Sequence, residues 1–384
     1  MHVMNISKSS FNFYLFASVV IFIVAVYSYA LIDPNLTLFN SPLWVKFRDP
    51  LVYFGYYQRG YSMIVYTILV IAIYAIYKIG VRNYRSLSLL KITGIISIIL
   101  LFSYPFLSHD FFNYIFVAKI LTFYGQNPYT TPPSQFQGDE WLRFMHWVHR
   151  PYPYGPTFLA VTLIPSFFAA GKFILNFLFF KLLSVIFYVL GVYYLHKIER
   201  KAAFIFALHP LVIVEGLINV HNDLLAVSFG IIGIYYLLSS KRVLGRLALI
   251  ISVGIKYLSL PLVILISKNK LTYFLALCGQ LVLLLYLSFA REIQPWYFLS
   301  LFTFLPFYKS IISRSEIFIF GLLMSYYPYI YLGGWDKTYK VVMKHQIIWL
   351  GLFLNLIYIF YLIWKKRKNI KLSLFQDIIG WNNK

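Results

Sequence analysis

Residues 173–196 read FILNFLFFKLLSVIFYVLGVYYLH, an apolar run in which Lys181 is the only residue of the types Asp, Glu, Lys and Arg. A helix needs roughly 20 apolar residues to cross the hydrocarbon core of a bilayer, so this run predicts a membrane-spanning helix. Lys197, Arg200 and Lys201 follow the run directly. Cations gathered at one end of an apolar run are typical of the cytoplasmic end of a membrane-spanning helix.

The composition of the whole chain indicates the same class of protein. Of its 384 residues, 60% are apolar and 12% are charged, whereas a soluble chain usually contains about 25% charged residues. A soluble globular enzyme would lack the polar surface to cover itself, and an aromatic content of 21% excludes a disordered chain. Cys278 is the only cysteine, which excludes a disulfide scaffold. An all-α polytopic membrane protein remains.

Hydropathy divides the chain into about 10–12 transmembrane helices of a single domain, residues 1–384. The predicted spans are 11–32, 61–79, 90–107, 173–196, 203–219, 224–239, 271–289, 297–310, 316–332 and 345–364. Two further apolar stretches are interrupted and predict half-length or re-entrant helices: 154–171 contains Pro165, and 246–267 contains Lys256 and Pro261. The first span is too long for a cleavable signal peptide, so we expect it to remain as an anchor.

The formal net charge of +22 is spread over short basic clusters between the apolar runs. Nucleic-acid-binding proteins gather cations on one soluble face, whereas clusters at alternate loops follow the positive-inside pattern. The clusters are Lys78, Arg82, Arg85 and Lys91; Lys197, Arg200 and Lys201; Lys241, Arg242 and Arg246; Lys268 and Lys270; Lys309 and Arg314; and the basic tail 365–384. With the N-terminus inside, all of them fall on the cytoplasmic side. The chain is rich in Ile, Lys, Tyr and Phe, which indicates an AT-rich coding sequence and favours a prokaryotic plasma membrane.

The longest polar stretch, residues 108–156, falls on the non-cytoplasmic side in this topology. A long loop in a chain of tight connections is usually functional, so we expect it to be an outer catalytic loop. It begins with Asp110 at the mouth of a span, and residues 111–124 alternate aromatic and polar side chains as an interfacial helix would. The segment 126–129, Gln-Asn-Pro-Tyr, then ends that helix.

Only 12 residues are Asp or Glu, so the candidates for acid–base chemistry can be examined one by one. Asp110, Glu215, Asp223 and Glu292 lie within a predicted span or at its outer boundary, where an ionisable group is costly unless paired and therefore indicates function. The other carboxylates are Glu199, Glu316 and Asp377 at the inner side, Asp33, Asp49 and Asp336 in outer loops without polar neighbours, and Asp139 and Glu140 in the catalytic loop, where we expect them to be solvated.

A polar stripe runs along residues 215–223, Glu-Gly-Leu-Ile-Asn-Val-His-Asn-Asp. On a helix, Glu215, Asn219 and Asp223 share one face. At the outer end of a span such a stripe points into a cavity, or it acts as hydrogen-bonding glue between helices. Lys256, inside an apolar stretch, must likewise pair with a carboxylate such as Glu215 or Asp223 or meet an anionic ligand.

The segment 291–297, Arg-Glu-Ile-Gln-Pro-Trp-Tyr, lies at the outer end of a predicted span. Gln294 and Pro295 break the helix at a point where the rim of a pocket could form. Trp296 and Tyr297 suit the same rim, or the aromatic belt that membrane proteins place at the interface.

His146 and His149, with Asp139 and Glu140 nearby in the sequence, could ligate a cation. An HxxH pair in an aromatic loop is not sufficient to indicate zinc, so we predict no metal and no cofactor, although a divalent cation is compatible with the chemistry. The chain contains no phosphate-cradling glycine loop and no GxSxG motif. An activated donor substrate would therefore be lipid-linked.

Taken in order, the chain presents Asp110, Tyr114, Gly125-Gln126-Asn127-Pro128-Tyr129 with Pro132, Tyr154-Gly155-Pro156, His209-Pro210-Leu211, Glu215-Gly216, His221-Asn222-Asp223, Lys256 and Gln294-Pro295-Trp296-Tyr297. From about residue 105 to 300, this series resembles the polyprenyl-phosphomannose-dependent α-mannosyltransferases, membrane-embedded glycosyltransferases of the GT-C class. One departure is that Asp110 follows the third predicted span, whereas the catalytic carboxylate of this class typically lies in the loop after the first. Extra N-terminal helices would explain the shift.

The resemblance implies transfer of a hexose, expected to be mannose, from a polyprenyl-phosphate-linked donor to a lipid-linked or surface glycan on the non-cytoplasmic side. Asp110 is then the expected catalytic residue, since an inverting transfer needs a general base near the acceptor hydroxyl. Arg150, Lys256 and Arg291 could stabilise the leaving phosphate. The other expected substrate-binding residues are His109, Asn113, Asn127, Tyr129, Tyr154, Glu215, His221, Asn222, Asp223, Trp296 and Tyr297. The expected partners are membrane lipid, the donor and the acceptor glycan, and not nucleic acid.

Two non-enzymatic functions fit the same sequence. A transporter or flippase for a glycolipid would also contain buried charges and broken helices, although the long aromatic loop and the lack of an internal repeat count against it. The second is a non-catalytic membrane subunit of a glycan-assembly complex. An enzyme requires Asp110, residues 221–223 and Lys256 to come together around one cavity, so the positions of these residues distinguish the functions.

Overall fold

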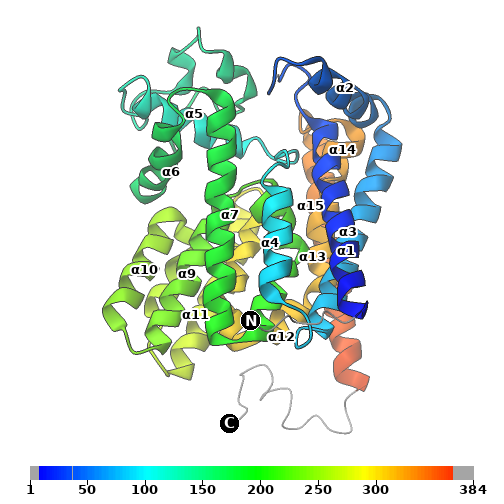
Figure 1. Cartoon of the computed structure of the whole chain (residues 1–384). Coiled ribbons are helices and arrows are strands. Elements are labelled where there is room, and N and C mark those ends of the chain that lie inside the picture. Colours follow the sequence, from blue (N-terminus) through cyan, green and yellow to red (C-terminus); the bar gives the residue numbers. More distant parts are fainter. Residues whose placement is uncertain (1–7, 37, 366–384) are drawn as a thin grey trace, which may run out of the picture.

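Five long apolar helices form the frame of the fold (Figure 1). The computed structural model describes residues 8–36 and 38–365, and these residues contain helices and no strand. The five helices are α1 (Lys8–Tyr27), α3 (Arg59–Arg82), α7 (Phe173–Ile198), α11 (Lys270–Ala290) and α15 (Thr338–Lys365). The predicted all-α polytopic membrane fold is confirmed. Residues 366–384, most of the predicted basic tail, lie outside the described residues.

A sixth candidate span is bent in the middle. The helix α8 (Arg200–Leu208) and the π-helix η4 (Val212–Ile218) meet at 68°. Pro210 explains the bend, because proline lacks an N–H and disfavours a helical conformation in the residue before it. His209 is accordingly extended, with ψ at 130°. The bend delivers the polar segment 215–223 into the interior of the molecule.

Shorter helices occupy the remaining predicted spans and the two interrupted stretches. They are α4 (Leu89–Leu100), α6 (Pro156–Phe168), α9 (Asp223–Leu238), α10 (Arg242–Ile255), α13 (Glu316–Met324) and α14 (Tyr327–Leu332). The predicted interruption at Lys256 is present, since this residue is extended between α10 and the 3₁₀-helix η5 (Tyr257–Ile264). The span predicted at 297–310 is divided between the 3₁₀-helix η6 (Pro295–Phe304) and α12 (Leu305–Arg314).

The candidate site lies toward one end of this frame. Figure 1 shows α2 (Pro42–Tyr57), α5 (Asp110–Thr122) and α6 at that end and α12 at the opposite end. The helix predicted at 111–124 is present as α5, but it does not present a polar face to an interface. Every residue from Phe111 to Ile120 is buried, because α5 packs against α6, α7 and the loop that follows it.

Lys181, the lone charge of the run 173–196, is fully buried. Its ammonium group donates to the Ser103 hydroxyl at 2.8 Å and to the carbonyl oxygens of Leu217 and Ile218 at 2.5 and 3.2 Å. Leu217 and Ile218 are the last two residues of η4. The carbonyl oxygens at the end of a helix have no partner inside the helix, so they need a donor from elsewhere. Lys181 therefore ties η4 to α7 and fixes the start of the polar segment.

Replacing Lys181 by methionine is expected to lower the free energy of unfolding by about 3 kcal/mol, because the substitution keeps the apolar volume and leaves buried carbonyl oxygens without a donor. Thermal unfolding of the purified protein in detergent, followed by tryptophan fluorescence, measures the effect. Lys172→Met, at the exposed start of the same helix, is the control and should leave the transition unchanged. Equal transition temperatures for the Lys181 variant and the wild type would contradict this role.

Candidate active site

Asp110 stands in the first turn of α5, directly after an extended loop. Its backbone N–H donates to the Ser108 hydroxyl at 3.2 Å, and its negative charge suits the positive end of the helix dipole. The carboxylate side chain is 17% exposed. Asp110 is therefore a helix-anchored carboxylate that a substrate can still reach.

His221 links Asp110 to a second carboxylate. Its Nδ1 lies 3.7 Å from Asp110 Oδ2, and its Nε2 lies 3.3 Å from Glu215 Oε2. His221 and Glu215 are completely buried. The imidazole ring stacks on Trp296, with ring centroids 3.8 Å apart and an angle of 14° between the planes. Stacking fixes the ring plane, so the two nitrogens of His221 face the two carboxylates.

Asn219 joins Glu215, at one end of this group of three side chains, to the loop before α5. The Asn219 amide nitrogen donates to Glu215 Oε2 at 3.1 Å, and its oxygen accepts from the backbone N–H of Leu107 at 3.2 Å. Val220 adopts a positive φ of 58°, which turns the chain between η4 and α9. A line of close polar groups thus runs from the π-helix through His221 to Asp110, with neither ring nitrogen of His221 hydrogen-bonded within the described residues.

Lys256 forms a second polar group beside this network. Its ammonium group donates to Asn222 Oδ1 at 3.0 Å and to Asp223 Oδ2 at 2.9 Å. It also lies 5.7 Å from the ring centroid of Tyr154 and 5.5 Å from that of Tyr297. Asn222 Nδ2 and Asp223 Oδ1 are buried without a hydrogen-bond partner. Each of these two buried atoms can therefore still form a hydrogen bond.

Tyr154 connects the two polar groups, because its ring centroid lies 5.7 Å from the Lys256 ammonium and its hydroxyl is near enough for the charges of Asp110 and Asp223 to act on it. The Tyr-Gly-Pro motif explains its position. A Cβ atom at Gly155 would lie 2.7 Å from the carbonyl oxygen of Gly254, so only glycine permits this approach of α6 to α10. The contact brings Tyr154 over Lys256, two residues beyond Gly254. Asp110, residues 221–223 and Lys256 therefore lie in one cluster.

Two predicted residues, Asn113 and Arg150, border this cluster. Asn113, one turn after Asp110 on α5, is buried and its side-chain oxygen has no hydrogen-bond partner. Together with Arg150 and Tyr154 it lines a small cavity of about 20 Å³. The Arg150 guanidinium is exposed and lies 4.2 Å from the ring centroid of Trp147.

Three other predicted residues have different surroundings. Asn127 builds a turn, because its side-chain oxygen accepts from the Tyr129 N–H at 3.0 Å. Tyr129 is exposed and contacts Tyr152, whose ring in turn packs on Tyr154. Arg291 is an exposed residue at the end of α11. Within the described part of the chain, neither Asn127 nor Arg291 forms a hydrogen bond or an ion pair with Asp110 or Lys256.

The structure corrects the expected surroundings of Asp139. This carboxylate was expected to be solvated, but it is buried in an ion pair with Lys119 of α5. Tyr124 also donates to it at 2.7 Å, and the Lys119 ammonium lies 3.6 Å from the ring centroid of Trp141. The pair ties the loop that contains Asp139 onto α5, which explains why that helix is buried.

The surroundings predicted for Asp33 and Glu292 need similar corrections. Asp33 was expected to lack polar neighbours, yet its carboxylate accepts from Asn35 and interacts electrostatically with His109. Glu292 was a candidate functional group and instead forms an ion pair at 2.7 Å with Lys344 of α15, which also donates to Gln294. Asp336 and Asp49 are paired as well, with Lys340 and Arg48.

Tyr326, which lies between α13 and α14, is a further residue near the site that the sequence pattern does not indicate. Its ring is buried and its hydroxyl interacts electrostatically with Glu215. Tyr66 of α3 lies nearby, donates to the Leu323 carbonyl at 2.9 Å and interacts with Glu215 as well. Both tyrosines are far from Glu215 in the chain and sit among other aromatics, so no sequence pattern distinguishes them.

His109 and His146 stack on one another next to Asp110, with ring centroids 4.1 Å apart. Burial, and then the neighbouring His146, lower the pKa of His109 to about 4. Burial also lowers the pKa of His146. His149 instead contacts Trp147, so the two histidines of the HxxH pair do not share neighbours. At neutral pH the Asp110 carboxylate is therefore close to uncharged imidazole rings.

These shifts predict a dependence of stability on pH. Unfolded histidine has a pKa of about 6.5, so below that pH the unfolded chain binds a proton that native His109 rejects until about pH 4. Stability should fall as the pH falls through this window, and His109 should account for about 2 kcal/mol between pH 6.5 and 4.5. Thermal unfolding at several pH values tests this, because His109→Gln should show the smaller decrease. A parallel pH dependence in both proteins would contradict the assignment.

A family of proteins described as alpha-(1->6)-mannopyranosyltransferase, N-terminal domain, matches residues 15–269. The matched region contains Asp110, residues 215–223 and Lys256, and it ends before Trp296. No curated protein and no solved structure matches the chain. The match extends over more than half of the 384 residues, and the chain belongs to this alpha-(1->6)-mannopyranosyltransferase family.

Proposed function

We propose that the protein transfers mannose from a polyprenyl-phosphate-linked donor to a hydroxyl of a lipid-linked or surface glycan, on the non-cytoplasmic side of the membrane. Membership of the family supports mannosyl transfer as the reaction. The observation that supports a phosphate-linked donor is a cluster that contains a carboxylate next to a histidine, Asp110 and His221, and a buried cation, Lys256, paired with Asp223. The family description further suggests the 6-hydroxyl of a mannosyl residue as the acceptor.

Asp110 is proposed to act as the general base. The acceptor oxygen attacks C1 of the donor sugar and its proton passes to Asp110, while the bond from C1 to the phosphate oxygen breaks and the phosphate leaves with the electron pair. The position of His221 between Asp110 and Glu215 supports this role. Glu215 orients the imidazole, and the imidazole in turn orients the base.

Lys256 is proposed to stabilise the leaving phosphate. Charge develops on the phosphate as the glycosidic bond breaks, and a fixed cation in a site sheltered from water stabilises that charge strongly. Two of the three ammonium protons point to Asn222 and Asp223, which leaves one for a phosphate oxygen. The unpartnered Asn222 Nδ2 can donate a further bond. Arg150, on the exposed loop, offers a second cation, and with these groups we expect no requirement for a divalent cation.

The donor class can be tested with a panel of activated sugars. Purified protein in lipid nanodiscs would receive labelled polyprenyl-phosphomannose, polyprenyl-phosphoglucose or GDP-mannose, with dodecyl mannoside as the acceptor. We expect label in the acceptor from polyprenyl-phosphomannose, in the presence or absence of EDTA. Transfer from GDP-mannose and not from the lipid-linked donors would contradict the proposed function.

One feature favours a second candidate, a flippase for the same glycolipid. The bent pair α8 and η4 and the break at Lys256 place two interrupted helices at the polar cluster, and interrupted helices commonly build transport sites. A flippase would move the donor across the bilayer without separating its sugar from its phosphate.

A further inference from the structure

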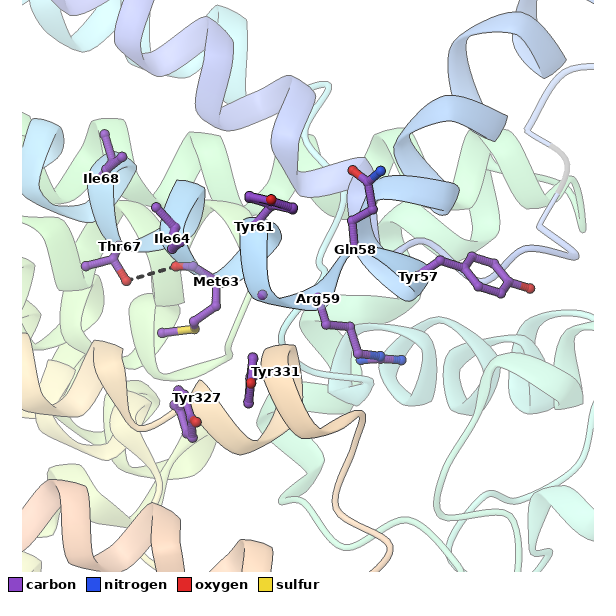
Figure 2. A pocket seen from close by; sticks show the side chains of 11 residues that line it. Tyr57, Gln58, Arg59, Tyr61, Met63, Ile64, Thr67, Ile68, Tyr327 and Tyr331 are labelled. Carbon is purple, nitrogen blue, oxygen red and sulfur yellow. Dashed lines mark hydrogen bonds between the residues drawn. The ribbon is translucent and has the colours of Figure 1, made fainter.

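A groove runs along the membrane-embedded surface between α3 and α14 (Figure 2). Its volume is about 740 Å³. Figure 2 shows Met63 and Arg59 of α3 facing Tyr327 and Tyr331 of α14 across it. Further along α3 from Arg59, the wall continues with Ile64 and Ile68, whose side chains are 56% and 58% exposed. Exposed isoleucines within a membrane span face the hydrocarbon of the bilayer, so a lipid chain can enter the groove from the side.

Arg59 is the one charged side chain among the described residues that line the groove. Its guanidinium donates to the Ile330 carbonyl at 3.1 Å and lies 5.3 Å from the ring centroid of Tyr56. Gly333, with a φ of +85°, ends α14 against it, and a Cβ atom there would lie 3.1 Å from the guanidinium carbon. Arg59 is thus held in place and has no ion-pair partner among the described residues. A phosphate suits the remaining donors, because guanidinium binds phosphate in a planar, bidentate geometry.

The mouth of the groove carries polar and aromatic groups that suit a sugar. Tyr57, Gln58 and Tyr61 line the groove near Arg59, although Figure 2 shows Tyr57 and Gln58 pointing away from the guanidinium. On the opposite wall Tyr327 and Tyr331 stack with ring centroids 5.1 Å apart. Tyrosine offers an apolar face and a hydroxyl together, which is the combination that a glycan at the membrane interface requires.

The residues that line the groove are sequence neighbours of buried tyrosines near Glu215. Thr67 and Tyr327 line the groove, while the residues next to them in the chain, Tyr66 and Tyr326, face Glu215. At the mouth, the Tyr56 hydroxyl donates to the Leu31 carbonyl at 3.4 Å. Asp33, two residues further along the chain, is close enough for its charge to act on His109, the neighbour of Asp110.

We propose that this groove binds the acceptor substrate, a glycolipid whose sugar is joined to its chain through a phosphate. The phosphate binds Arg59, the chain lies along Ile64 and Ile68, and the sugar extends past Asp33 toward Asp110. This inference rests on the proposed function. The groove does not include Lys256, the residue assigned to the donor phosphate, so the two lipid substrates would have separate sites.

The test compares two synthetic acceptors, dodecyl mannoside and a dodecyl phosphodiester joined through glycerol to the same mannoside. In Arg59→Gln the KM for the phosphodiester should rise about ten-fold, the equivalent of about 1.4 kcal/mol, with kcat unchanged. The KM values for dodecyl mannoside and for the donor should stay the same, and Arg59→Lys should recover part of the loss. Arg82→Gln, at an exposed arginine in the last turn of the same helix α3, is the control. An increase in the donor KM, or no change in any KM, would overturn the proposal.

A binding measurement separates the groove from the reaction. The phosphodiester lipid, carrying a diazirine in its chain, is photocrosslinked to the protein in nanodiscs without donor, and the labelled peptides are identified by mass spectrometry. Labelling of the peptide with Ile64 and Ile68, lost in Arg59→Gln, supports the groove even where no transfer is detected. Labelling elsewhere, or labelling that Arg59→Gln does not change, overturns the proposal even where transfer is normal.

Discussion

Replacing Asp110 by asparagine is expected to lower the rate of mannosyl transfer about 1,000-fold and to leave the protein folded. Asparagine has nearly the same shape as aspartate and keeps its place in the first turn of α5, but it cannot accept the proton of the acceptor hydroxyl. The effect should appear in kcat, because the substitution removes a group that acts in the transition state and leaves the binding of the lipid substrates intact. Initial rates at saturating donor, with varied acceptor, measure it.

The control for this variant is Asp49→Asn. Asp49 is an exposed carboxylate of α2 at the same end of the molecule and forms an ion pair with Arg48. Its substitution should leave kcat and the thermal transition unchanged. If Asp110→Asn retains the wild-type kcat, or raises only KM, Asp110 is not the base, and Glu215 becomes the next carboxylate to examine.

The second large effect is expected at Lys256. Lys256→Met should lower kcat about 1,000-fold, since a cation aimed at the leaving phosphate contributes several kcal/mol in a site sheltered from water. It should also destabilise the protein by about 4 kcal/mol, because buried Asp223 would lose the partner of its charge. Transfer rates and thermal unfolding of the purified variant measure the two effects.

A double variant distinguishes the catalytic role from the structural one. Lys256→Met combined with Asp223→Asn removes both members of the buried pair, so it should recover much of the stability. Transfer should remain absent, because the phosphate still lacks its cation. Recovery of both stability and activity in the double variant would show that Lys256 serves only to neutralise Asp223.

The sequence predicted those parts of the site that depend on position along the chain. The run 173–196 is long and apolar enough to define α7 within two residues. The break at Lys256 followed from a charge in an apolar stretch. Its pairing with Asp223 was one of the alternatives that the sequence allowed, and the structure selects it.

Other parts depend on tertiary packing and could not be predicted. Tyr326 meets Glu215, and Lys344 meets Glu292, because helices remote in the chain pack together. Asp139 was expected to be solvated because it lies in a polar loop, whereas the fold places Lys119 beside it. The burial of α5 is a consequence of the same packing. Hydropathy reports how apolar a segment is, and it does not report which segments will cover it.

The central claim is that this cluster breaks the bond between sugar and phosphate, and a doubly labelled donor tests it most directly. Polyprenyl-phosphomannose with ¹⁴C in the sugar and ³²P in the phosphate would be placed in proteoliposomes with purified protein and dodecyl mannoside. The account predicts that the two labels separate in equal amounts, with ¹⁴C in the acceptor and ³²P in polyprenyl phosphate, and that Asp110→Asn prevents the separation. Movement of both labels together across the bilayer, without separation, would contradict the account and identify a flippase.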